Sequence, residues 1–363
     1  MANLHKFLTD RAHLEWESVK AELEASPYYL TVKEDDTLVL FMYDQIRSDF
    51  SLPIVQDSRG IILERGSWNF VCRPFTKFFN YGEVNAAQID WSTAKVQEKL
   101  DGSIMKMYFY RETWRVASNS CIYALEDFEI MFRECAEQYV ATSWPRLDPA
   151  YTYIFELIHP SNQVVVRYKT KRLVLIGVRE NASGKEVEPA KLNLSFDLPH
   201  FFPFTSLDQS LEFVNSEDFR DEGFVVVDAN FNRIKIKSKL YLKMAMAKAQ
   251  ISDHAGLVMA VIKNEVDEYL TYFPEDKPEV ESIREKVNLF TDEMIFRFKN
   301  TIMVAKTRKE FAVSVNTTSR EYSRILFKFY DIVCRDRLEL EKTNPKVKDV
   351  IRDFWISQSA KFI

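Results

Sequence analysis

The sequence predicts an α+β protein, with an antiparallel-rich body over residues 1–240 and an all-helical domain over residues 241–363. Up to Lys237, short runs rich in β-branched and aromatic residues alternate with turns, which is typical of strands in an antiparallel sheet. After Ser238, Leu, Met, Ile and Phe recur at helical spacing with charged residues between them. Strands followed by a block of helices indicate an α+β arrangement rather than repeated βαβ units.

The individual elements follow from the same periodicities. Residues 5–24 interleave charges with Phe7, Leu14 and Trp16, which predicts one helix, and a second is expected at residues 123–139. The expected strands are residues 37–43, 60–63, 96–99, 104–110, 114–117, 153–157, 164–168, 173–178, 224–228 and 233–237.

The composition is that of an ordinary globular chain of 363 residues, 46% hydrophobic and with a formal net charge of −5. This charge does not itself indicate a nucleic-acid partner, although a local basic groove would suffice for one. The four cysteines lack metal-ligand spacing, and no signal peptide or membrane-spanning run is evident. We therefore expect a cytoplasmic protein with reduced thiols and no membrane partner.

Lys99 lies in the run Glu98-Lys99-Leu100-Asp101-Gly102-Ser103, at the end of a predicted strand. A lysine amine is a nucleophile only when it is unprotonated, and its ordinary pKa is about 10.4. Burial or nearby cations can lower that value, and an adjacent glycine lets a phosphate approach the backbone. Taken alone, the four residues Lys99-Leu100-Asp101-Gly102 fit a surface lysine before a hairpin turn better than they fit a nucleophile.

Lys235 and Lys237 alternate with Ile234 and Ile236, which places both amines on one face of a strand. Two such cations suit a bound phosphate and suit a solvated edge strand equally well. Glu222 begins another apolar strand, where its carboxylate could hold a divalent metal, accept a proton from a lysine, or simply form a turn.

The order of several short segments favours a nucleophile and a phosphate site over a solvated turn and an edge strand. Lys-x-Asp-Gly is the signature of covalent nucleotidyltransferases, and the region from about residue 37 to residue 241 resembles the phage-type RNA ligase family, which includes tRNA-repair enzymes. The segments that carry this resemblance are residues 57–62, 73–80, 98–103, 155–156, 160–162, 178–181, 222–224 and 235–238.

The resemblance implies a nucleotidyltransferase domain of the ATP-grasp-like ligase type at residues 1–240. It makes Lys99 the nucleophile that forms a lysyl-adenylate. It places Lys235 and Lys237 on the α-phosphate, where one of them assists the departure of pyrophosphate. Glu222 keeps its two roles, metal ligand or proton acceptor.

The resemblance also assigns further nucleotide contacts. Arg59 and Lys77 are expected to touch ATP, and Phe79 to support the site. Glu156 would meet a ribose hydroxyl, and Tyr43 would contact the nucleotide. Residues 117–120 depart from the family, since relatives commonly carry lysines there and this chain has Ala-Ser-Asn-Ser.

The helical tail is less specific. Asp267 occupies a place comparable to an acidic pair linked with metal in the family, but a solvated helix face explains it better. The tail could also recognise the RNA substrate. No β-barrel pattern follows Lys237, which argues against DNA ligases and capping enzymes because these usually append an OB-fold.

We therefore expect an ATP-dependent RNA ligase that seals 5′-phosphate and 3′-hydroxyl ends through lysyl-adenylate and adenylylated RNA. Its cofactors would be ATP and Mg²⁺, with Mn²⁺ as a possible substitute. Its substrates would be single-stranded RNA ends or a broken tRNA loop, in RNA or tRNA repair during phage infection. The alternatives are a DNA ligase, another nucleotidyltransferase, and a catalytically inactive RNA-binding relative.

Overall fold

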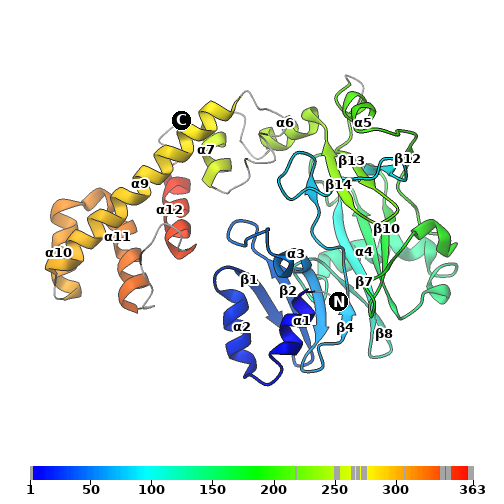
Figure 1. Cartoon of the computed structure of the whole chain (residues 1–363), viewed down its shortest axis with the longest axis horizontal. Coiled ribbons are helices and arrows are strands. Elements are labelled where there is room, and N and C mark those ends of the chain that lie inside the picture. Colours follow the sequence, from blue (N-terminus) through cyan, green and yellow to red (C-terminus); the bar gives the residue numbers. More distant parts are fainter. Residues whose placement is uncertain are drawn as a thin grey trace. The chain divides into compact units, whose positions relative to one another are not determined.

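The computed structural model describes residues 3–216, 219–248, 254–262, 266, 270, 276–305, 307–335, 340 and 345–358 (Figure 1). The chain divides into two compact units, Met1–Ala245 and Met246–Ile363. The change from one unit to the next occurs within helix α6 (Lys239–Lys248).

The N-terminal part of unit 1 is a four-stranded antiparallel sheet covered by helices. Its strands, in spatial order, are β1 (Leu30–Glu34), β2 (Leu38–Tyr43), β3 (Arg59–Glu64) and β4 (Phe70–Cys72). The accompanying helices are α1 (Asn3–Asp10), α2 (Trp16–Glu24) and α3 (Pro53–Asp57). Apolar side chains of α1 and α2 pack with Val39, Phe41 and Leu63 of the sheet.

The second sheet supplies the segment that follows Lys99. Its strand order is β11 (Glu186–Val187), β10 (Arg172–Glu180), β9 (Tyr151–Ile158), β7 (Ser103–Tyr110) and β8 (Thr113–Ala117). Helix α4 (Glu126–Ala136) and the short helical turns Glu137–Tyr139 and Trp144–Arg146 cover one face. Met105, Met107 and Phe155 point into this core, so alternate residues such as Ile104 and Glu156 point to the opposite face.

The third sheet carries most of the predicted phosphate site. Its strand order is β12 (Phe201–Phe202), β6 (Lys95–Lys99), β13 (Gly223–Val227), β14 (Arg233–Lys237) and β5 (Phe79–Asn80). The β14–β5 pair is parallel and the other pairs are antiparallel. Helix α5 (Leu207–Val214) and a cluster that includes Ile234 and Ile236 cover one face. The turn Pro189–Leu192 links the second and third sheets.

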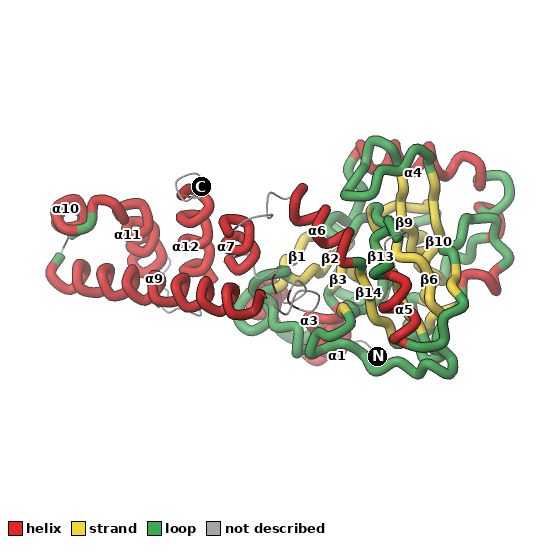
Figure 2. Tube along the Cα trace, turned by 90° about the horizontal axis from the view of Figure 1, so that it is seen from above, coloured by secondary structure: helices red, strands yellow, loops and turns green. Residues whose placement is uncertain are grey.

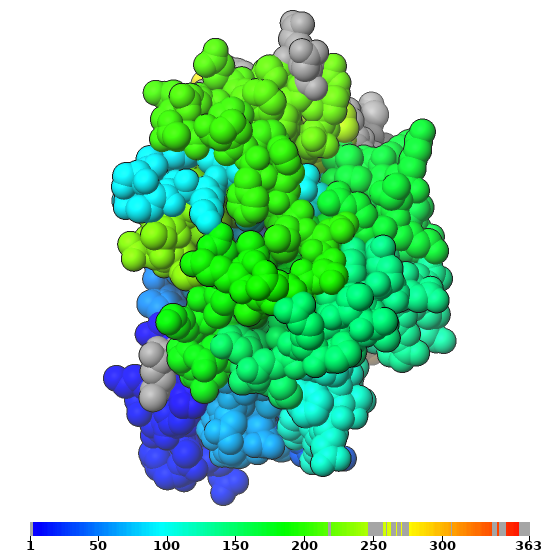
Figure 3. All heavy atoms as spheres, turned by 90° about the vertical axis from the view of Figure 1, so that its right-hand side faces the viewer, coloured from blue at the N-terminus to red at the C-terminus, as the bar shows by residue number. Residues whose placement is uncertain are grey.

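Figure 3 shows unit 1 with its N-terminal residues, in dark blue, at one end and the light green segment around residues 200–240 at the other.

In the residues that the structure describes, unit 2 consists of helices joined by short loops, and its helices are among the red tubes of Figure 2. Its elements are α7 (His254–Ile262), α9 (Lys277–Val304), α10 (Arg308–Thr318), the turn Arg320–Tyr322, α11 (Ser323–Tyr330), the π-turn Asp331–Arg335 and α12 (Pro345–Gln358). Phe298, Phe311 and Phe329 form the centre of its core. Across the described residues of both units, every helix is too short or too polar to cross a bilayer.

The predicted α+β class and the helical tail are confirmed, and two predicted elements are wrong. Residues 5–24 form two helices rather than one, because a break at residues 11–15 lets both α1 and α2 pack on the same core. Residues 164–168 form a loop rather than a strand, because the N–H groups of Val165 and Val166 donate to the side chain of Asp101. The helix predicted at 123–139 begins later, at Glu126.

Candidate active site

Strand β13 lies between the two strands that carry the candidate lysines. Gly223 pairs in register with Lys99 of β6 on one side and with Lys237 of β14 on the other. Gly223 has φ +151°, and a Cβ there would lie 2.0 Å from the carbonyl oxygen of Ile236. Glycine is therefore the residue that allows β13 to approach β14 at this point.

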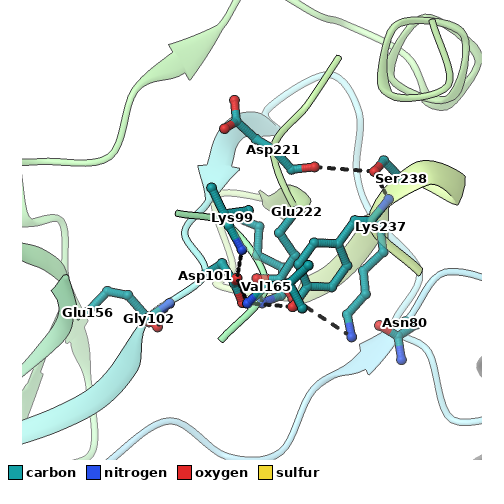
Figure 4. Close-up of polar contacts among 12 residues, drawn as sticks. Asn80, Lys99, Asp101, Gly102, Glu156, Val165, Asp221, Glu222, Lys237 and Ser238 are labelled. Atoms are coloured by element: carbon teal, nitrogen blue, oxygen red, sulfur yellow. Dashed lines mark hydrogen bonds and ion pairs between the residues drawn. The ribbon is translucent and has the colours of Figure 1, made fainter. Parts of the chain in front are cut away.

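Glu222 contacts both of these lysines. Its Oε2 lies 2.6 Å from Lys99 Nζ, and its Oε1 lies 3.8 Å from Lys237 Nζ (Figure 4). Glu222 is only 4% exposed, and a buried carboxylate requires such cationic partners. The arrangement places a proton acceptor within hydrogen-bonding distance of the candidate nucleophile.

Asp101 fixes the segment that follows Lys99. Its Oδ2 accepts hydrogen bonds from Val165 N at 2.7 Å and Val166 N at 2.6 Å, and its Oδ1 accepts one from the Tyr241 hydroxyl at 2.7 Å. Gly102 has no room for a side chain, since a Cβ would lie 2.4 Å from the Leu157 carbonyl oxygen. The Asp-Gly pair is thus a tightly held connection between β6 and β7 and not an exposed hairpin turn.

Glu156 lies on β9, directly opposite Ile104 of β7. Its Oε1 accepts a hydrogen bond of 3.1 Å from the Gly102 N–H. Burial raises the pKa of this carboxyl to about 8, although the charge of Lys99 opposes the change. Glu156 is therefore mostly protonated at neutral pH and can donate as well as accept a hydrogen bond.

Lys235 occupies β14 opposite Val225 of β13, on the same face as Lys237. Its isoleucine neighbours point into the opposite core, as their alternation predicted. Burial lowers the pKa of Lys235 to about 7, and the positive charges of Arg59 and Lys99 contribute next. A bound anion would remove this electrostatic conflict.

Aromatic rings surround the remaining predicted ATP contacts. The Arg59 guanidinium carbon lies 5.1 Å from the centre of the Phe78 ring, and Lys235 Nζ lies 5.1 Å from the same centre. Tyr43 lies beside Lys77, with 4.7 Å between its ring centre and Lys77 Nζ.

Two neighbouring cavities connect these groups. One of about 110 Å³ is lined by Lys99, Arg59, Glu156 and Lys235, with Ile104, Ile176 and Val225 among the apolar residues. A second, of about 430 Å³, is lined by Lys77 and Phe79 and shares Phe75, Phe78 and Arg233 with the first. Arg59, Lys99, Glu156 and Lys235 thus converge on one cavity, whereas Lys77 lines the next one.

Of the two predicted metal ligands, Glu222 and Asp267, the structure describes only Glu222. Glu222 lies beside Lys99, whereas Asp267 falls outside the described residues. Within the described ranges, no three His, Cys, Asp or Glu side chains cluster closely enough to form a metal cage. Magnesium commonly binds through one or two carboxylates together with substrate phosphates and water, so Glu222 with a bound nucleotide would fit it.

Four residues at or beside the site were not predicted from the sequence. Phe50 contacts Lys77, Tyr241 contacts Asp101, and Lys106 is fully buried and donates to the Gly60 carbonyl oxygen. Asn80 is 4% exposed, lies near Lys237 in Figure 4, and donates from Nδ2 to Glu83. Its position in the segment 73–80 was the only local signal for any of the four.

The chain is similar in sequence to known RNA ligases. The sequence model of the RNA ligase family matches residues 57–241. A protein of Autographa californica nuclear polyhedrosis virus, provisionally described as a bifunctional polynucleotide kinase/RNA ligase, is 30% identical over 285 residues, which cover 72% of this chain and 41% of that protein. A protein of Thermovibrio ammonificans, provisionally described as an RNA ligase, is 29% identical over 241 residues, 62% of each chain. The RNA ligase of Rhodothermus phage RM378 is 26% identical over 308 residues, 64% of this chain and 69% of the other.

The chain thus spans less than two thirds of the length of the first two relatives. Among solved structures, a mutant Naegleria gruberi RNA ligase with ATP and Mn is 16% identical, with a TM-score of 0.35, over 42% of this chain and 51% of that one. The family match covers just over half of the chain and includes all of the strands that surround Lys99. The chain therefore belongs to the phage-type RNA ligase family.

Proposed function

We propose that this protein is an ATP-dependent RNA ligase with Lys99 as its nucleophile. The observation that carries the proposal is the position of Lys99 Nζ, 2.6 Å from the buried Glu222 carboxylate and in the same cavity as Arg59 and Lys235. This arrangement combines a nucleophile, a proton acceptor and cations for a phosphate, which nucleophilic attack on ATP requires.

The reaction would proceed in three transfers. Lys99 Nζ bonds to the α-phosphorus, the bond from that phosphorus to the bridging oxygen breaks, and pyrophosphate leaves. An RNA 5′-phosphate oxygen then attacks the same phosphorus, which releases the lysine and forms adenylylated RNA. Finally a 3′-hydroxyl attacks the RNA phosphorus, AMP leaves, and a phosphodiester is formed.

The surrounding residues would have distinct roles. Glu222 would take the proton that Lys99 loses, while Lys235 and Lys237 bind the α-phosphate. Glu156 would hydrogen bond a ribose hydroxyl. Arg59 and Lys77 would bind the β- and γ-phosphates, with Tyr43 beside Lys77. These assignments rest on the positions described above and on family membership.

A divalent cation, most simply Mg²⁺, would screen the phosphates and polarise them for displacement. Glu222 is the described carboxylate that could help to hold it, and Asp267 remains a proposed ligand. Mn²⁺ could substitute, because it shares the preference of Mg²⁺ for oxygen ligands.

The substrates would be RNA ends with a 5′-phosphate and a 3′-hydroxyl, including a broken tRNA loop. The similarity to phage RNA ligases supports a role in RNA repair in the cytoplasm of an infected bacterium. Unit 2 would contribute to substrate choice.

The deciding experiment is incubation with α-labelled ATP and Mg²⁺, followed by denaturing electrophoresis. A labelled protein band that pyrophosphate removes is expected for the wild type and not for Lys99→Ala. Lys95→Ala is the matched control, because Lys95 is an exposed lysine on the same strand that pairs with Glu188. Protein that is purified already adenylylated is first treated with pyrophosphate. Absence of the band in the wild type, or its persistence in Lys99→Ala, would refute the proposal.

A second assay distinguishes the alternatives. Nicked RNA, single-stranded RNA ends, a broken tRNA loop and nicked DNA are offered side by side to the adenylylated enzyme. Sealing of the RNA substrates is expected. Preference for nicked DNA would refute the RNA assignment and leave the lysyl-adenylate intact.

A further inference from the structure

The ammonium group of Lys77 is surrounded by three aromatic rings. Lys77 Nζ lies 4.2 Å from the ring centre of Phe50, 4.7 Å from that of Tyr43 and 5.4 Å from that of Phe79. The Phe50 ring stands nearly perpendicular to the other two, at 83° to Tyr43 and 78° to Phe79, so the three rings form a corner. Each ring offers a site of negative electrostatic potential to a cation. We call Tyr43, Phe50 and Phe79 the aromatic cage.

The backbone ties Lys77 to the loop that carries Phe50. Lys77 N donates to the carbonyl oxygen of Gln56 at 2.8 Å, and Gln56 Nε2 donates to the carbonyl oxygen of Phe50 at 2.8 Å. Gln56 therefore holds both residues at once. The cage is a fixed part of unit 1, built from β2, the loop before α3, and β5.

In the part of the chain that the structure describes, Lys77 is surrounded by rings and not by carboxylates. Among the described residues, no carboxylate forms an ion pair with Lys77, and its positive charge helps to lower the pKa of Lys235. The rings can stabilise the ammonium without neutralising it, so its full charge stays available to a ligand. Such an arrangement favours binding of an anion that reaches both Lys235 and Lys77.

The residues that line the two cavities indicate which phosphates of ATP would contact Lys77. The α-phosphate must lie within reach of Lys99, which lines the smaller cavity together with Lys235. Lys77 lines the neighbouring cavity and is not among the residues around Lys99. ATP has two phosphates beyond the one that Lys99 would attack, and these are the groups that could extend into the neighbouring cavity.

We propose that Phe50 is a positioning residue whose ring, with those of Tyr43 and Phe79, holds the Lys77 ammonium for the two phosphates that leave as pyrophosphate. The inference rests on the proposed ATP-dependent adenylylation. It makes the cage important for attack on ATP and for the reverse reaction with pyrophosphate. It makes the cage unimportant for sealing RNA that is already adenylylated, because no pyrophosphate takes part in that step.

The test compares Phe50→Leu, which removes the ring and retains an apolar side chain, with Phe50→Tyr, which retains the ring. For Phe50→Leu we expect the KM for ATP in adenylylation, and the KM for pyrophosphate in its reversal, to rise about tenfold. Sealing of pre-adenylylated RNA without ATP should stay within about twofold of the wild type, since it uses neither phosphate. Phe50→Tyr should restore both KM values.

Phe70→Leu is the matched control, because it also removes a ring from a cation contact, with 4.1 Å between the Phe70 ring centre and the Arg73 guanidinium carbon. It should leave the KM for ATP unchanged. If Phe50→Leu does not fold, Tyr43→Leu tests the same cage from the opposite wall. An unchanged KM for ATP, or an equal loss in sealing of pre-adenylylated RNA, would overturn the inference. A wild type without any lysyl-adenylate would instead refute the proposed function.

Discussion

Tyr241 donates its hydroxyl to Oδ1 of Asp101 across 2.7 Å, although the two residues are 140 positions apart in the sequence. Tyr241 lies in the first turns of α6, and its N–H donates to the side chain of Ser238, which follows β14. The contact therefore joins the segment after Lys99 to the segment after Lys237.

Loss of this contact should slow adenylylation more than it unfolds the protein. For Tyr241→Phe we expect a 10- to 100-fold lower rate, since a hydrogen bond to a charged group contributes about 1.5–3 kcal/mol. Tyr123→Phe is the control, because it removes a similar tyrosine–aspartate hydrogen bond of 3.0 Å, to Asp35. Single-turnover labelling with ATP measures the rate, and thermal unfolding checks the fold. Equal rates for the two variants would contradict a role for Tyr241 at the site.

Removal of the Glu222 charge should block proton transfer from Lys99. We expect Glu222→Gln to lower the adenylylation rate about 100-fold, because the amide keeps the shape but cannot take the proton. Asp221→Asn is the control at the adjacent, exposed carboxylate. A rate for Glu222→Gln that matches the control would show that Lys99 loses its proton elsewhere.

Lys235 should destabilise the ligand-free protein while serving the anion site. Its folded-state pKa of about 7 lies below its ordinary value, so the folded state binds fewer protons than the unfolded state. The destabilisation is therefore full below about pH 7 and fades as the pH rises towards the unfolded-state pKa. We expect Lys235→Met to raise the melting temperature by roughly 2–4 °C at pH 6 and much less at pH 9, while adenylylation is lost. A variant that melts lower than the wild type at pH 6 would contradict this account.

Glu156 should give ATP binding a pH dependence near 8. The carboxyl is mostly protonated below about pH 8 and becomes charged above it. If the protonated form binds the ribose, the KM of the wild type should rise up to about tenfold per pH unit above 8, as for one titrating group. Glu156→Gln mimics the protonated form, so its KM should be close to that of the wild type at pH 7 and should not rise in this range. The same rise in both proteins would assign the pH effect to another group.

The local pattern of the chain predicted the strands better than the contacts between them. Alternation placed Lys235 and Lys237 on one face because a strand has a period of two. The hydrogen bonds of Asp101 to Val165 and Val166 had no local signal, and they turned a predicted strand into a loop. Long-range polar contacts of this kind depend on the whole fold and not on any window of sequence.

In the candidate site too, residues in local motifs could be predicted, whereas residues placed by long-range contacts could not. Lys99 and Glu222 could be named from motifs, because family membership fixes residue types at recognisable spacings. Phe50 could not, because it lies in a loop whose position depends on Gln56, and a phenylalanine before a turn is otherwise an ordinary core residue. The functional role of Asp267 stays a prediction.

The register of β13 and β14 sets a limit on how this protein can change by insertion. Gly223 faces Lys237 across a hairpin whose turn is closed by Asp228, which accepts hydrogen bonds from Asn230 and Asn232. A shift of β14 by one residue would exchange its two faces, placing the lysines in the apolar core and the isoleucines beside Lys99. Only insertions that shift β14 by an even number of residues keep the lysines on the face beside Lys99. The length of the turn at Asp228 therefore determines which side chains lie at the other end of the hairpin.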